Sequence, residues 1–164
     1  EILVVDNAGR LDEGCIGDLI TLEAKLAGIA AIVLWGAHRD SGQLPEIGLP
    51  IFSLGSIPTG PSRLDARGTD AFQRAQLGEA TVFPGDLVVA DADGVIVVDW
   101  DNSSRVLELA TQIQKTEISQ AAKMRAGTSL RSQLKFEEYL AQRKRSAGYT
   151  FRMHLQKSGG AVET

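Results

Sequence analysis

Two acidic side chains and one guanidinium group have the types and spacing of a site that binds a cation together with an anion. Asp18 follows a glycine at the predicted start of a helix, and Arg39 and Asp40 follow a run of apolar residues. Carboxylate oxygens are the ligands that Mg²⁺ prefers, and a guanidinium is a permanently charged donor for anionic oxygens. Free N–H groups at the helix start would supply further donors for an anion. The three residues therefore indicate a metal ion and an anionic substrate.

The elements predicted around these residues would bring them together. Apolar runs over residues 2–5 and 29–35 predict two buried strands, and residues 6–9 predict a turn after the first. The pattern over residues 17–28 predicts a helix between the strands. In a strand–helix–strand unit, the helix begins at the edge of the sheet where the second strand ends. The three polar residues should therefore meet at that edge, where open α/β sheets usually place ligands.

The predicted helix also allows a simpler interpretation of Asp18. An acidic side chain at a helix start is favoured by capping and by the helix dipole, without any further role. Apolar residues at spacings of three and four predict one stripe packed against the sheet, comprising Leu19, Leu22, Leu26 and Ile29. An Arg-Asp pair alone is usually a surface feature. It is the expected meeting of Asp18 with Arg39 and Asp40 that favours a functional site.

Other polar residues have interpretations in local structure. Asp6, and the three aspartates of residues 86–93, stand in predicted turns, where aspartate and glycine tolerate unusual backbone angles. His38 is expected to be an exposed loop histidine. Residues 81–83, 87–90 and 95–98 predict short strands joined by these turns. A metal site built from the turn aspartates is therefore not favoured.

The pattern of Asp18 and Arg39-Asp40 resembles the signature of the aldolase branch of the RraA-like family, which is named for a regulator of ribonuclease E activity. The matching segments cover most of residues 1 to about 127 and include Leu3-Val4-Val5-Asp6, Ala24-Lys25-Leu26-Ala27-Gly28, Leu49-Pro50-Ile51-Phe52 and residues 83–95. The branch contains 4-hydroxy-4-methyl-2-oxoglutarate aldolase, a metal-dependent pyruvate aldolase that also decarboxylates oxaloacetate. The resemblance thus implies a lyase that acts on small 2-oxo acids through a pyruvate enolate.

The resemblance also implies roles for individual residues. Asp40 would hold a Mg²⁺ or Mn²⁺ ion, and Asp18 would support it through bound water. Arg39 would bind the C2 oxygen of the substrate and stabilise the enolate, and the backbone N–H groups of Leu19 and Ile20 would bind its carboxylate. A Schiff-base route is less favoured, because no lysine other than the mid-helix Lys25 precedes residue 115.

The fold implied by the resemblance is α/β: a swivelling β/β/α layered domain with mixed parallel and antiparallel strands, followed by C-terminal helices. Residues 1–127 would form the aldolase core, and residues 128–164 a C-terminal helix and arm. Trimers, or hexamers of paired trimers, are usual in the family. Members usually carry a further N-terminal portion, so a chain that begins at Glu1 within a strand looks truncated or processed.

The C-terminal third is predicted to be helical. Capping residues at 101–103 start a long helix that Gly127 ends, and residues 129–146 predict a second, basic helix followed by an arm. The resemblance makes Glu117, on the long helix, a weak candidate for reaching the site of a neighbouring subunit. Residues 1–100 carry a net charge of −9 and residues 101–164 one of +5. The basic region could be a solvated surface, or could contact an acidic neighbour or a nucleic acid.

Composition limits the remaining possibilities. The net charge of −4 argues against a general nucleic-acid binder, and the apolar runs are too short to span a membrane. One cysteine, Cys15, cannot form an internal disulfide, which favours a reducing compartment and a cytoplasmic location. The main alternative is a non-catalytic regulator that binds a ribonuclease, as the name-giving branch of the family does. A methyltransferase is not favoured, because no glycine-rich strand–loop–helix motif suits S-adenosylmethionine.

Overall fold

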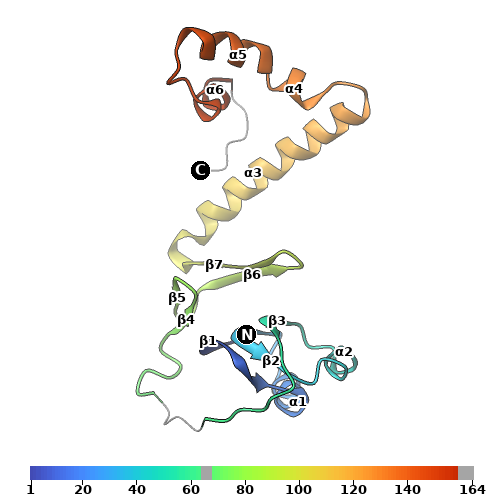
Figure 1. Cartoon of the computed structure of the whole chain (residues 1–164), viewed down its shortest axis with the longest axis vertical. Coiled ribbons are helices and arrows are strands. Elements are labelled where there is room, and N and C mark those ends of the chain that lie inside the picture. Colours follow the sequence, from blue (N-terminus) through green and yellow to red (C-terminus); the bar gives the residue numbers. More distant parts are fainter. Residues whose placement is uncertain (64–67, 159–164) are drawn as a thin grey trace. The chain divides into compact units, whose positions relative to one another are not determined.

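The structure is a computed structural model that describes residues 1–63 and 68–158. Its contacts divide the chain into two compact units, Glu1–Ser103 and Ser104–Thr164, called here the N-terminal and C-terminal units (Figure 1). The division falls inside helix α3 (Trp100–Arg125), whereas the boundary expected from the sequence lies after residue 127, two residues beyond the end of that helix. The two units are therefore described separately.

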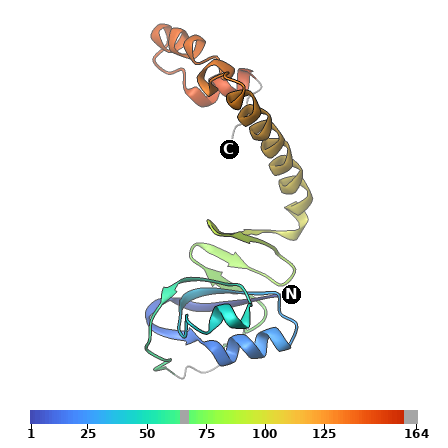
Figure 2. The same cartoon turned by 90° about the vertical axis from the view of Figure 1, so that its right-hand side faces the viewer.

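A three-stranded parallel sheet lies at the centre of the N-terminal unit. Its order is β1 (Ile2–Ile16), β2 (Ala31–His38) and β3 (Ile51–Ser56). Helix α1 (Asp18–Leu26) connects β1 to β2, and the short helix α2 (Leu44–Ile47) connects β2 to β3. Right-handed crossovers that proceed in one direction place their helices on one face of a sheet, and Figure 2 shows α1 and α2 side by side there.

The core forms where α1 and the central strand meet. The consecutive residues Ile32, Val33 and Leu34 of β2 are almost fully buried, as expected for a parallel strand covered on both faces. The side of α1 that is buried carries small residues, Thr21 and Ala24, and the Thr21 hydroxyl donates to the Gly17 carbonyl. Small side chains let the helix backbone approach the sheet closely.

Of the apolar stripe predicted to cover the sheet, Ile29 packs against the core, but the three leucines of α1 are wrong as a description of its buried face. Leu19 and Leu26 are each about three-quarters exposed, at 75% and 76%, and Leu22 is also exposed. Leucines at helical spacing predict a face that is covered, but within this chain the covered face is the one with the shorter side chains. The leucines instead border a groove of about 470 Å³ between α1 and α2.

The first strand is longer than predicted. We expected a turn at residues 6–9, but β1 continues to Ile16 and stays paired with β2. The pairing shifts register between Asp6 and Arg10 and twice more before Ile16. Ala8 and Gly9 adopt positive φ values of 54° and 68°, which form an irregularity inside the strand instead of reversing the chain.

Two antiparallel hairpins follow, and the second of them was predicted from its turn residues. The first joins β4 (Ala75–Leu77) to β5 (Ala80–Val82), and the second joins β6 (Leu87–Asp91) to β7 (Gly94–Val98). The Asp91 carboxylate accepts a hydrogen bond from the Asp93 N–H in the second turn. Parallel and antiparallel strands with C-terminal helices confirm the predicted mixed α/β class.

The C-terminal unit is helical but differs in detail from the prediction. The single helix expected over residues 129–146 is two helices, α4 (Leu130–Gln133) and α5 (Phe136–Arg145), because Lys135 adopts a left-handed φ of 50°. The expected arm contains helix α6 (Phe151–Ser158). None of the helices in the described residues is long and apolar enough to cross a membrane.

Candidate functional site

The structure brings Asp18, Arg39 and Asp40 together at the carboxyl edge of the parallel sheet. Asp18 opens α1 immediately after β1, and Arg39 and Asp40 leave the end of β2. The ends of these strands are held in register by the Arg39 N–H, which donates to the Ile16 carbonyl over 2.8 Å. Asp40 has a positive φ of 59°, which turns the chain sharply toward α2. Adjacent parallel strands thus deliver all three residues to one place.

The Asp40 carboxylate lies at the start of α1. Its Oδ2 atom is 3.3 Å from the backbone nitrogen of Asp18, which donates to it, and 3.5 Å from Nε of Arg39. The side chains of Arg39 and Asp40 are 41% and 34% exposed. An anionic side chain at a helix N-terminus is stabilised by the unpaired N–H groups there. The N–H groups and the guanidinium offset part of the negative charge of Asp18 and Asp40, at a place that is open to solvent.

Glycines allow this close approach. A methyl group added at Gly17 would overlap Asp40 Oδ2 and would lie 2.9 Å from Nε of Arg39. A methyl group at Gly14 would lie 3.0 Å from Cβ of Arg39. Side chains at these two positions would therefore push the polar residues away from β1 and the helix start.

Asp18 also binds the first turn of its own helix. Its Oδ1 atom accepts a hydrogen bond of 2.7 Å from the Leu19 N–H. Leu19 and Ile20 stand in the first turn, where backbone N–H groups have no acceptor within the helix, and their side chains are exposed. The two backbone donors predicted to bind a carboxylate are therefore at the helix start beside Asp40, and one of them is bonded to Asp18.

Of two further residues near the site, His38 differs from its prediction and Glu13 was not identified from the sequence. His38 ends β2 and is not an exposed loop residue, since its ring nitrogens lie 2.8 Å from Ser53 Oγ and 3.0 Å from Ser41 Oγ. Glu13, on β1, is 2% exposed, and the backbone N–H of Ser62 beside its carboxylate lowers its pKa. The predicted turn at residues 6–9 ended the first strand before Glu13, and burial along residues 10–16 does not alternate, so no periodic pattern marks this position.

The other acidic candidates have local roles in the structure. Asp6 accepts hydrogen bonds from the N–H groups of Ala8 and Gln76, and Asp86 accepts one from Phe83. The bond from Phe83 agrees with the turn interpretation of Asp86, whereas Asp6 lies within β1 and also bonds to a residue far along the chain. Glu117 is exposed on α3 in the C-terminal unit.

The donor set at the helix start suits a cation that needs few protein ligands. Within residues 1–63 and 68–158, no three His, Cys, Asp or Glu side chains gather around a common point. Mg²⁺ commonly takes one or two carboxylates and completes its shell with water and substrate oxygens. Asp40 and Asp18 can supply that number, whereas a structural zinc site needs four protein ligands.

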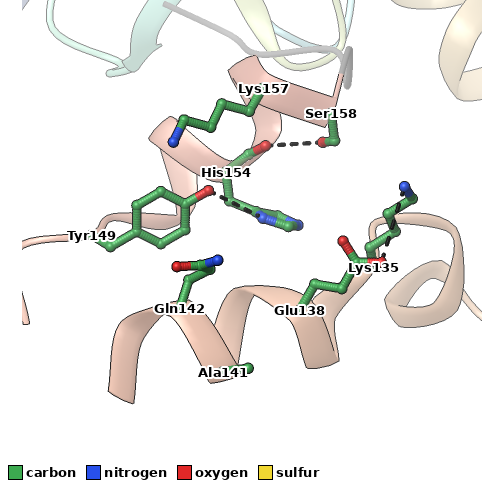
Figure 3. A pocket seen from close by; sticks show the side chains of 8 residues that line it. All are labelled: Lys135, Glu138, Ala141, Gln142, Tyr149, His154, Lys157 and Ser158. Atoms are coloured by element: carbon green, nitrogen blue, oxygen red, sulfur yellow. Dashed lines mark hydrogen bonds and ion pairs between the residues drawn. The ribbon is translucent and has the colours of Figure 1, made fainter. Parts of the chain in front are cut away.

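A separate pocket lies in the C-terminal unit, between α5 and α6 (Figure 3). It has a volume of about 360 Å³ and is lined by Lys135, Glu138, Ala141, Gln142, Tyr149, His154, Lys157 and Ser158. His154 is buried, and its ring nitrogens lie 2.8 Å from the Leu134 carbonyl oxygen and 3.4 Å from the Tyr149 hydroxyl. Both nitrogens are thus engaged within the unit, and the histidine has the contacts of a structural residue.

Comparison with known proteins assigns the N-terminal unit. The sequence model of the RraA-like family, described as Aldolase/RraA, matches residues 1–97, which include the whole polar edge of the sheet. The chain therefore belongs to the RraA-like family. That family joins aldolase-type members with ribonuclease inhibitors, so membership alone allows both kinds of function.

Individual relatives represent both kinds. A protein of Halalkalibacterium halodurans named "Putative 4-hydroxy-4-methyl-2-oxoglutarate aldolase" is 31% identical over 114 residues, which are 70% of this chain and 53% of that protein. The chain thus spans about half the length of this curated relative. Streptomyces coelicolor RraAS2, described as an unusual member of the RNase ES inhibitor RraA protein family, is 32% identical, with a TM-score of 0.64, over 76% of this chain and 62% of that one. An uncharacterised protein from Pseudomonas syringae is 28% identical, with a TM-score of 0.69, over 79% and 64% of the two chains.

Proposed function

We propose that the chain is a metal-dependent lyase that cleaves 4-hydroxy-2-oxo acids, or decarboxylates oxaloacetate, through a pyruvate enolate. The observation that carries the proposal is the meeting of Asp18, Arg39 and Asp40 at the start of α1, with Oδ2 of Asp40 within 3.5 Å of both neighbours. An aldolase-type relative that matches 70% of the chain supports the same class of reaction.

Each side chain has a role that its chemistry permits. Asp40 and Asp18 would hold a Mg²⁺ or Mn²⁺ ion, which when bound supplies a Lewis acid for the substrate's oxygens. Arg39 would donate hydrogen bonds to the C2 oxygen as negative charge develops on it, a role suited to a group that stays protonated. The N–H groups of Leu19 and Ile20 would bind the substrate carboxylate. Binding at Leu19 requires Asp18 to give up its present hydrogen bond to that N–H.

The two reactions share one electron movement. In oxaloacetate, the C3–C4 bond breaks, carbon dioxide leaves, and the bonding electron pair forms the enolate of pyruvate. In a 4-hydroxy-2-oxo acid, the same bond breaks as the 4-hydroxyl loses its proton and a carbonyl compound leaves. A proton then adds to C3 in both cases. Stabilising the C2 oxyanion lowers both barriers, so one guanidinium in one position serves both substrates.

Pyruvate release from oxaloacetate tests the proposal. We expect release with added Mg²⁺, measured by coupling to lactate dehydrogenase, and loss of that release when excess chelator removes the metal. Arg39→Ala and Asp40→Ala should each lower the rate by about 100-fold or more, because each removes charge stabilisation that the transition state needs.

A matched control separates the site from general effects of charge. Arg74→Ala removes an arginine that is paired with Asp70 and lies outside the site, and it should leave the rate unchanged. Circular dichroism of each variant checks that it is folded. Release no faster than that caused by Mg²⁺ alone, or near-normal rates in both Arg39→Ala and Asp40→Ala, would contradict the proposed lyase.

A second candidate function is supported by the similarity to RraAS2, which is described as a member of a ribonuclease-inhibitor family. In this case the chain would bind a ribonuclease and would not need the polar site for chemistry. Inhibition of a purified ribonuclease that persists in Asp40→Ala, without pyruvate release by the unmodified chain, would favour the regulator. Assembly into a trimer or hexamer is compatible with either function, and light scattering after size-exclusion chromatography would measure it.

A further inference from the structure

We propose that Glu13 is a positioning residue that clamps residues 59–62 onto the end of β1 and thereby fixes the guanidinium of Arg39. The catalytic consequence of this clamp rests on the proposed function, whereas the clamp itself does not. The segment follows β3 and passes beside the polar edge of the sheet.

The first contact of the clamp is made by a buried carboxylate. Glu13 is 2% exposed, and its Oε2 atom accepts two hydrogen bonds from Ser62: one of 3.0 Å from the backbone N–H and one of 3.1 Å from the hydroxyl. Burying a carboxylate is costly unless it is paired and hydrogen-bonded. Here the bonds that stabilise it also hold the segment in place.

The second contact is made by the next residue of β1. The Gly14 N–H donates to the Thr59 carbonyl over 2.8 Å. Residues 59 and 62 are thus both attached to β1, and Gly60 lies between the two attachment points. A methyl group added at Gly60 would be 3.0 Å from Nη1 of Arg39, so the backbone at Gly60 lies against the guanidinium.

The opposite side of Arg39 is also bounded. A methyl group at Gly14 would touch its Cβ, one at Gly17 would lie 2.9 Å from its Nε, and Asp40 Oδ2 lies 3.5 Å from Nε. The Arg39 side chain, although 41% exposed, is therefore bounded by β1 at its Cβ, by the helix start at Nε and by the clamped segment at Nη1. Releasing the segment would remove one of these three boundaries.

Charges around Glu13 strengthen the clamp. Its Oε1 atom is 3.6 Å from Nη1 of Arg10 and 3.7 Å from Nε of Arg63. The Ser62 backbone N–H and these two guanidinium groups lower the pKa of Glu13, so the carboxylate remains ionised at neutral pH. Arg63 also pairs with the exposed Asp12 over 2.8 Å. Asp12 therefore shares the arginine but makes neither of the bonds to Ser62.

The test follows the side-chain Nε–H resonance of Arg39 by nuclear magnetic resonance, assigned by its loss in Arg39→Lys. In Glu13→Ala we expect this resonance to shift toward that of a freely rotating arginine, and the Ser62 amide to exchange with solvent at least ten-fold faster. Glu13→Gln should restore much of the original signal, because its carboxamide oxygen can still accept the Ser62 N–H. Asp12→Ala is the matched control and should leave both signals unchanged.

A second variant tests the clamp without altering β1. Ser62→Pro removes both donors from an exposed position, so it applies even where Glu13→Ala fails to fold. An Arg39 resonance that is unchanged in Glu13→Ala or Ser62→Pro would overturn the proposal. An equal change in Asp12→Ala would also overturn it, by assigning the effect to the exposed ion pair.

Turnover then separates the clamp from the proposed function. Glu13→Ala should lower kcat for pyruvate release by between about ten- and a hundred-fold, since a small misplacement of a catalytic group has that effect. It should lower kcat no further in an Arg39→Ala background. Equal losses in the two backgrounds would overturn the positioning role. A chain that releases no pyruvate would contradict the lyase, while the Arg39 resonance still decides the clamp.

Discussion

The N-terminal unit and the C-terminal unit are each stabilised by a different kind of packing. The N-terminal unit carries a net charge of −10 and packs α1 against a parallel sheet through Thr21, Ala24 and the apolar side chains of β2. The C-terminal unit carries a net charge of +6, and its short helices pack through rings, with Tyr139 5.1 Å from Phe151 and 5.4 Å from Phe136 between ring centroids.

The difference shows where positions are tightly specified. Around Arg39 and Asp40, a methyl group added at Gly17 would overlap a polar atom, and one added at Gly14 or Gly60 would make a tight contact of 3.0 Å with Arg39. Around Tyr139, tilted and edge-on rings make contacts that tolerate small changes in angle. The first arrangement can hold reacting groups in place, and the second supports a helical framework. The family match over residues 1–97 covers only the first.

The largest expected effect is on the helical unit. Tyr139→Ala removes a ring that is 7% exposed, and we expect it to lower the free energy of unfolding of the C-terminal unit by about 3–5 kcal/mol. Thermal unfolding followed by circular dichroism at 222 nm measures this, with Leu107→Ala at an exposed position of α3 as the control. Pyruvate release should survive below the new melting temperature. Its loss there would mean that the two units are not distinct in function.

The next effect tests the tight packing at the helix start. Gly17→Ala places a methyl group against Asp40 and Arg39 and should lower the free energy of unfolding by about 1–3 kcal/mol. The same variant should abolish most pyruvate release, because both side chains must move. Gly42→Ala is the control, since no atom lies within 4 Å of the added methyl group. Normal release by Gly17→Ala would show that the site is as adaptable as the aromatic cluster.

The smallest effect concerns the face of α1 that is buried. Leu26→Gln should change the free energy of unfolding of the monomer by no more than about 0.5 kcal/mol, because Leu26 is 76% exposed. Ala24→Gln, on the buried face, should cost about 1–3 kcal/mol, because it buries an amide without a partner. Urea denaturation compares the two. The reverse order would show that the leucine stripe covers the sheet, as its spacing alone predicted.

The same helix shows which features of the fold and site are readable from sequence. Its start, its end before Gly28 and the following strand were predicted from a glycine, an acidic first turn and an apolar run. The meeting of Asp18 with Arg39 and Asp40 followed from topology alone. Its buried face was not predictable, because spacing identifies an apolar face but does not say what covers it. Small residues that pack closely have no signal of their own.

Other errors have different physical origins. Lys135, where the predicted helix breaks, adopts a left-handed backbone conformation. No glycine, asparagine or proline stands there to indicate the break. In β1, Asp6 and Gly9 have the composition of a turn, yet the chain resumes its pairing with β2 at Arg10 after an irregularity at Ala8 and Gly9. Glu13 was missed for the same reason. Its partners lie 49 residues further along the chain, and contacts at that distance leave no local pattern.

The irregular pairing of β1 with β2 has a consequence for how related chains could diverge. From Asp6 to Ile16, β1 advances ten residues while β2 advances only three, from Trp35 to His38. The surplus residues lie at the three register shifts of β1, whereas the Arg39 N–H bonds to the Ile16 carbonyl at the end of the strand. We expect insertions or deletions between Asp6 and Arg10, at the first register shift, to be tolerated, whereas changes at Glu13 or Gly14 should release residues 59–62 from β1. The two parts of β1 would thus differ in how much change of sequence they tolerate.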